Sequence, residues 1–147
     1  MLSRVLIASD GSEATDHMMD CAKDLVSVGA RQATLVHVFH VRDVGGLHEQ
    51  LRQVMLPRLE AQRKIPEAAG LQAKVETPVG IPFVVINRLV LEQRADLILD
   101  RAGANDFTLI LMGSNGRGAV KELFLGGVAN NVARHAPLPV LFIPGVR

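Results

Sequence analysis

Short apolar runs alternate with amphipathic stretches along this chain of 147 residues, and that alternation predicts an α/β fold. Helices are predicted between the strands, which is typical of a parallel sheet covered on both faces. We therefore expect one domain, residues 1–147, built as a doubly wound, five-stranded parallel sheet. The predicted strands are residues 4–9, 33–39, 72–77, 108–112 and 138–143.

The first predicted helix follows the turn Asp10-Gly11-Ser12. The Ser12 side chain is expected to accept an N–H bond from the first turn of this helix. Apolar residues at helical spacing continue to about Val28, and Gly29 is expected to end the helix.

Residues 42–70 are polar and amphipathic. Their periodicity predicts one long helix or two shorter ones, with Gly45-Gly46 as a hinge or loop. Pro57 and Pro66 are expected to kink or break this helical segment.

Two segments compete for the fourth strand, Ala95–Leu99 and Thr108–Met112. Because Met112 directly precedes Gly113, we assign the strand to residues 108–112. The helix that begins at Pro82 is then predicted to continue through Leu99 to about Arg101; the alternative is an extra strand at residues 95–99. The last helix is predicted from Val128 to about His135.

The charge balance, aromatic content and cysteine count argue against several classes of function. Net charge is +1, and aromatic residues make up only 3% of the chain, so neither a basic patch nor a base-stacking platform for nucleic acid is expected. Cys21 is the single cysteine, which excludes an intrachain disulfide and a cysteine-based metal cluster. No set of His, Asp and Glu has metal-site spacing. No apolar run reaches the roughly 18–20 residues of a membrane span, and we expect a cytoplasmic protein.

Glycines are concentrated after the fourth predicted strand. Gly113 and Gly116 enclose Ser114 and Asn115, and Gly126-Gly127 precede the last helix. Exposed backbone N–H groups in such loops and at helix N-termini bind anionic oxygens, so the segment is a candidate phosphate site. A flexible turn after a strand explains the same glycines.

Asp10 ends the first predicted strand and has two interpretations. A carboxylate in this position commonly caps the next helix or a turn. Alternatively, it lies beside a bound nucleotide. Loops that follow neighbouring parallel strands meet at one edge of the sheet, so the turns at residues 10–12 and 113–116 are expected to converge.

The segment Val5–Glu13 and the spacing Gly113-x-x-Gly116, nine residues, then Gly126 together resemble the universal stress protein family. The resemblance implies strand order 3-2-1-4-5, a homodimer formed through the last strand, Leu138–Ile143, and in many members a bound ATP or other adenine nucleotide, with Mg only alongside ATP. In ATP-binding members the signature ends in Ser or Thr, whereas this chain has Gly127. That substitution removes a hydroxyl and keeps the amide, so we expect weakened binding or binding of a shortened nucleotide.

The resemblance also implies where the nucleotide lies. Asp10 corresponds to an aspartate that contacts the nucleoside, and main chain at Val38 to His40 lines the adenine pocket. The implied binding residues are Ala8, Ser9, Asp10, Gly11, Val38, Phe39, Met112, Gly113, Ser114, Asn115, Gly116, Arg117, Gly126, Gly127 and Val128.

Catalysis is not expected, because the chain lacks a Gly-Lys-Ser/Thr phosphate loop, a carboxylate set for magnesium and a Gly-x-Ser-x-Gly elbow. The leading hypothesis is a stress-response module that acts by binding adenine nucleotide. The alternatives are a nucleotide-free dimeric interaction protein of the same fold and, less favoured, a slow ATPase.

Overall fold

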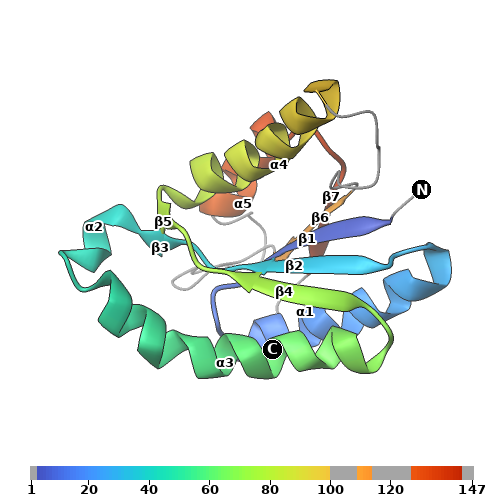
Figure 1. The fold of residues 1–147 in the computed structure, drawn as a ribbon, viewed down its shortest axis with the longest axis horizontal. Coiled ribbons are helices and arrows are strands. Elements are labelled where there is room, and N and C mark those ends of the chain that lie inside the picture. The colour runs from blue at the N-terminus through green and yellow to red at the C-terminus, as the bar shows by residue number, and fades with distance from the viewer. Residues whose placement is uncertain (1–2, 100–108, 114–126, 144–147) are drawn as a thin grey trace.

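A computed structural model of the chain describes residues 3–99, 109–113 and 127–143. These residues form a five-stranded sheet in the order β4-β2-β1-β6-β7, and each neighbouring pair is parallel (Figure 1). The predicted fold class and strand order are therefore confirmed. The strands are β1 (Arg4–Ala8), β2 (Gln32–Val36), β4 (Gln72–Glu76), β6 (Leu109–Gly113) and β7 (Val140–Ile143).

Helices cover both faces of this sheet (Figure 1). On one face α1 packs against α3, and α3 also contacts β4. On the other face α4 packs against α5. The bounds are α1 (Glu13–Asp24), the 3₁₀ turn η1 (Leu25–Val28), α2 (Val41–Val44), α3 (His48–Ala68), α4 (Pro82–Leu99) and α5 (Gly127–His135).

The core is divided by the sheet into two apolar clusters, because successive strand side chains point to opposite faces. In β1, Val5 and Ile7 join the cluster under α1 and α3, whereas Leu6 joins the cluster under α4 and α5. Leu6 and Ile7 are both fully buried. The continuous apolar sequence of β1 therefore reflects burial on both sides.

Residues 33–39 do not form one strand, contrary to prediction. β2 ends at Val36, and Phe39 begins a separate short strand, β3 (Phe39–His40), which pairs in parallel with β5 (Val79–Gly80). The interruption lies opposite Pro78, which has no N–H to donate to a ladder. The carbonyl of Pro78 still accepts a hydrogen bond from the Phe39 N–H at 2.9 Å.

The segment after β3 forms two helices, one of the two predicted outcomes. Gly45 and Gly46, both with positive φ, separate the short α2 from α3. Of the predicted kink or break at proline, the break is wrong, since α3 is continuous from His48 to Ala68 with Pro57 and Pro66 inside it.

The other boundaries agree with the sequence analysis within a few residues. Helix α4 includes residues 95–99, as assigned, and the extra-strand alternative is wrong. Gly29, with φ of 110°, ends the 3₁₀ turn η1 that follows α1. The last strand begins at Val140, two residues after the predicted start. Residues 100, 101, 108 and 119–125 lie outside the described residues.

Candidate functional site

The candidate site is at the carboxyl ends of the central strands. Ala8, the last residue of β1, pairs with Val36 of β2 on one side and with Met112 of β6 on the other. The turn that begins at Ser9 and the loop that begins at Gly113 therefore leave the same edge of the sheet. In a doubly wound sheet of this order the direction of winding reverses between β1 and β6, and ligands bind in the crevice at that point.

Only part of the glycine-rich loop can be placed. Met112 is buried and Gly113 is half-buried at the end of β6. Gly127 and Val128 are exposed and form the start of α5. The first N–H groups of a helix have no acceptor within the helix, so this start offers donors to an anion. Ser114, Asn115, Gly116, Arg117 and Gly126 lie outside the described residues. Within the described residues, the ends of β1 and β6 lie side by side up to Gly113.

The Asp10 carboxylate forms a local turn just before the first helix. Ser12 occupies the N-cap position, but its side chain makes no capping hydrogen bond, so that prediction is wrong. Asp10 Oδ1 instead accepts hydrogen bonds from the Ser12 N–H at 2.9 Å and from the Thr15 hydroxyl at 3.0 Å. A carboxylate that accepts from the N–H two residues later is a common local turn.

The two N–H groups that follow Asp10 in this turn are already used inside the protein. The Gly11 N–H donates to Ser9 Oγ at 3.0 Å, and the Ser12 N–H donates to Asp10. A ligand anion cannot take either group without breaking an existing hydrogen bond. The N–H groups of Gly11 and Ser12 are therefore not available to a ligand in this conformation.

Aromatic rings lie where β2 continues into β3. His37 Nδ1 donates to the carbonyl of Ser9 at 2.8 Å and so ties the end of β2 to the β1 turn. The Phe39 ring contacts the rings of His37 and His48 edge-on, at centroid distances of 4.7 and 5.2 Å. Val38 is half-buried and packs against the cluster under α4 and α5. The sequence analysis missed the bond between His37 and Ser9.

Two side chains of α3 also reach the β1–α1 turn, and the sequence analysis missed both. Arg58 Nε donates to the Gly11 carbonyl at 3.2 Å. Gln62 Nε2 donates to the Ser12 carbonyl at 3.2 Å. One signal was available in the sequence: Gln62 is polar, yet it lies on the same helical face as Met55 and Leu59.

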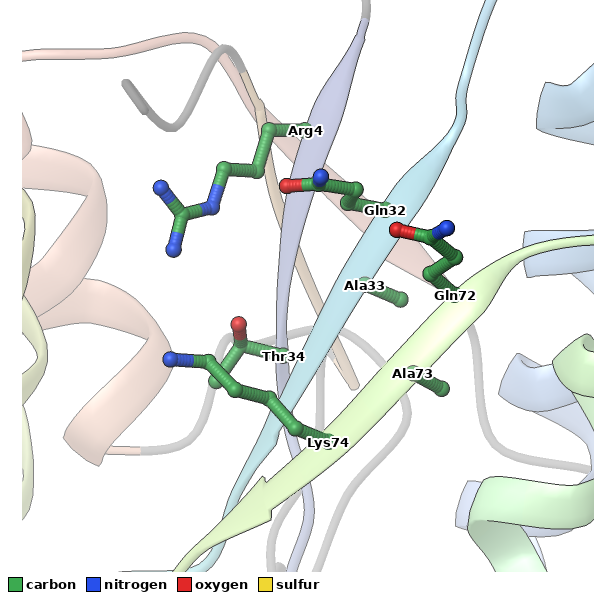
Figure 2. Close-up of a pocket in the computed structure, with 7 residues that line it drawn as sticks. All are labelled: Arg4, Gln32, Ala33, Thr34, Gln72, Ala73 and Lys74. Atoms are coloured by element: carbon green, nitrogen blue, oxygen red, sulfur yellow. The ribbon is translucent and has the colours of Figure 1, made fainter. Parts of the chain in front are cut away.

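A separate hollow of about 260 Å³ lies at the opposite end of the sheet, where β1, β2 and β4 begin. Figure 2 shows Arg4, Thr34 and Lys74 pointing to one side of the sheet, together with Gln32 and Gln72, and Ala33 and Ala73 pointing to the other. Lys74 is paired with Glu76 at 2.9 Å. Because parallel strands share their direction, this hollow is far from the Asp10 turn and is not the candidate site.

Within the described residues, no three His, Cys, Asp or Glu side chains are placed to hold a metal ion.

The pKa of Arg63 on α3 is raised, mainly by its hydrogen bond to Glu60. In the parts of the chain that the structure describes, no helix has the length and apolarity needed to cross a bilayer.

Comparison with known proteins identifies the family. The model of the universal stress protein family matches residues 1–144. A universal stress protein of Thermus aquaticus, encoded in the QAH/OAS sulfhydrylase 3' region, is 31% identical over 145 residues, which cover 97% of this chain and 99% of that protein.

Solved structures agree with this result. The structure of MJ0577, a universal stress protein of Methanocaldococcus jannaschii, is 25% identical with a TM-score of 0.82 over 100% of this chain and 99% of that one. A universal stress protein from Archaeoglobus fulgidus, solved in complex with dAMP, has the same fold, with 18% identity and a TM-score of 0.63 over 97% of this chain and 99% of that one. The chain belongs to the universal stress protein family.

Proposed function

We propose that this protein binds an adenine nucleotide at the carboxyl ends of β1, β2 and β6 and acts through binding rather than catalysis. The observation that carries the proposal is the pairing of Ala8 with both Val36 and Met112, which brings the Asp10 turn beside Gly113 at the switch point of the sheet. A family member with this fold binds dAMP, which supports an adenine nucleotide as the ligand class.

Each part of the nucleotide has a proposed partner. Main chain at Val38 and Phe39 holds the base, and Asp10 contacts the ribose. The first N–H groups of α5, at Gly127 and Val128, hold phosphate together with the loop after Gly113. Ser114, Asn115, Gly116, Arg117 and Gly126 belong to the same proposed site, and Mg enters only with ATP.

Isothermal titration calorimetry with ATP, ADP and AMP tests the proposal. We expect binding by the wild-type protein and about tenfold weaker binding by Asp10→Asn, equal to the loss of one hydrogen bond or charge contact of about 1.4 kcal/mol. Asp20→Asn is the matched control, because Asp20 is an exposed acid on α1 paired with Lys23. Absence of heat and of any thermal shift at millimolar nucleotide would refute the proposal.

Gly127 favours one alternative, a nucleotide-free interaction protein of the same fold. Family members that bind ATP are expected to have Ser or Thr at this position, and glycine lacks the hydroxyl. Mass spectrometry of the protein purified without added nucleotide separates the two functions, since a retained adenine nucleotide is expected only from the first. Phosphate release above background that Asp10→Asn abolishes would be needed to support slow ATP hydrolysis.

We further propose a homodimer formed through β7. This strand is at the edge of the sheet, and an unpaired edge strand can pair with a second chain. Leu141 is the large apolar residue exposed on it, at 40% of its surface.

A further inference from the structure

We propose that Arg58 and Gln62 of α3 are positioning residues for the nucleotide site: they hold the β1–α1 turn in the conformation that presents Asp10. This inference rests on the proposed function. It assigns α3, a helix that contributes none of the proposed ligand contacts, a direct part in setting nucleotide affinity.

Gln62 is the centre of the contact. Its side chain is fully buried, at 0% exposure. Its Oε1 accepts from the Ser9 hydroxyl at 2.8 Å, and its Nε2 donates to the Ser12 carbonyl at 3.2 Å and to Asp16 Oδ1 at 3.0 Å. A side-chain amide has two N–H donors, and both are used here. Gln62 therefore grips the turn on both sides of Asp10.

Arg58 makes a second, parallel contact one helical turn earlier. Its Nε donates to the Gly11 carbonyl at 3.2 Å, and its Nη2 pairs with Asp16 Oδ2 at 2.7 Å. The two oxygens of Asp16 thus receive one bond from Gln62 and one from Arg58. This shared carboxylate fixes both α3 side chains relative to the start of α1.

The bonds continue from α3 to Asp10 itself. The Ser9 hydroxyl that donates to Gln62 also accepts from the Gly11 N–H. The carbonyls of Gly11 and Ser12 are held by α3, and the Ser12 N–H is bonded to Asp10 Oδ1. The Gly11–Ser12 peptide group is therefore held at both its carbonyl and its N–H. A site ordered before binding does not spend binding free energy on ordering itself.

Gly11 itself packs closely against α3. Gly11 has φ of +77°, and a Cβ atom at this position would lie 2.6 Å from Sδ of Met55, also on α3. Met55, Arg58 and Gln62 are spaced three and four residues apart and so lie on one face of the helix. The same face of α3 therefore contacts the turn through both apolar and polar side chains.

The test compares Gln62→Met and Arg58→Met with Arg63→Met. Methionine keeps an unbranched side chain with good helix propensity and removes the hydrogen bonds. Arg63 is the matched control, because its ion pairs with Glu60 and Glu67 lie within α3. Dissociation constants for ATP are measured by calorimetry at 25 °C, well below each Tm, and Tm is measured without nucleotide.

We expect Kd to rise about tenfold in Gln62→Met and about fivefold in Arg58→Met, and to stay within twofold in Arg63→Met. Hydrogen exchange at the Gly11 and Ser12 amides, followed by NMR without nucleotide, is expected to accelerate in the first two variants and not in the control. A purely structural role predicts a lower Tm with unchanged Kd and unchanged exchange at these amides.

The outcomes separate this inference from the function on which it rests. No nucleotide binding by the wild-type protein overturns both. Wild-type binding with Kd unchanged in both α3 variants overturns only the positioning role. If Gln62→Met does not fold, Arg58→Met decides alone, because Arg58 is on the half-exposed rim of the contact.

Discussion

Replacement of Gly11 by alanine separates two physical costs that coincide at this residue. The first is backbone strain: φ is +77°, and a residue with a Cβ in the left-handed region costs about 1–2 kcal/mol. The second is steric, because the new Cβ would lie 2.6 Å from Met55 Sδ and 3.3 Å from Met55 Cε. The Met55 side chain is flexible but packs against the core cluster under α1 and α3, so moving its end costs packing of about 1 kcal/mol.

Gly46→Ala is the matched control for this substitution. Gly46 has φ of +85°, but a Cβ at this position meets no described atom within 4 Å. It therefore carries the strain without the clash, and the gain from stiffening the unfolded chain is common to both variants. We expect Gly46→Ala to lower the free energy of unfolding by about 1 kcal/mol and Gly11→Ala by about 2–3 kcal/mol.

Urea denaturation followed by circular dichroism measures both values, with unchanged m indicating that only stability has changed. A difference of 1–2 kcal/mol between the variants corresponds to about 2–8 °C in Tm for a domain of this size. In a Met55→Ala background the extra cost at Gly11 is expected to disappear, which a double-mutant cycle detects. Equal destabilisation of the two glycine variants, within about 0.5 kcal/mol, would refute the steric argument.

Three further substitutions test other parts of the structure. Gly127→Ser adds a hydroxyl at a position where a Cβ atom would have no described atom within 4 Å. Calorimetry should show ATP binding about 10- to 100-fold tighter, because a hydrogen bond to a charged group contributes about 1.5–3 kcal/mol. An unchanged Kd would contradict the proposed phosphate contact. Asn87→Leu removes a buried Oδ1 that has no hydrogen-bond partner among the described residues. Urea denaturation should show that the free energy of unfolding rises by about 1 kcal/mol. A fall of that size would show that the oxygen has a hydrogen-bond partner in the native protein. Leu141→Lys puts a charge on the edge strand β7, and light scattering at tens of micromolar should change from dimer to monomer; a wild-type monomer would remove the proposed interface.

The sheet could be predicted from sequence because its signals are local. The run Val5-Leu6-Ile7 is apolar on both faces, which is what a central parallel strand requires. The alternation in β4 likewise marked an edge strand: Ala73 and Val75 face the core, and Lys74 is exposed. Strand order came from the resemblance, not from these patterns.

The contacts of the site could not be predicted in the same way, because they join residues far apart in the chain. Gln62 and Ser9 are separated by 53 positions, and no periodicity connects them. The capping error is of another kind. Ser12 occupies the N-cap position, yet its side chain accepts no N–H bond from the helix, and composition does not show this; the Asp10 carboxylate bonds the N–H of Ser12 itself.

The two prolines inside α3 make its helical state depend on the rest of the molecule. Proline lacks the N–H that would bond to the carbonyl four residues earlier, so the carbonyls of Gln53 and Gln62 lose their partners within the helix. Each interior proline costs about 3 kcal/mol, which a peptide of this length cannot recover alone. We therefore expect α3 to be helical only while it packs against α1 and β4. A substitution that weakens this packing is therefore expected to weaken also the contacts of Arg58 and Gln62 with the β1–α1 turn.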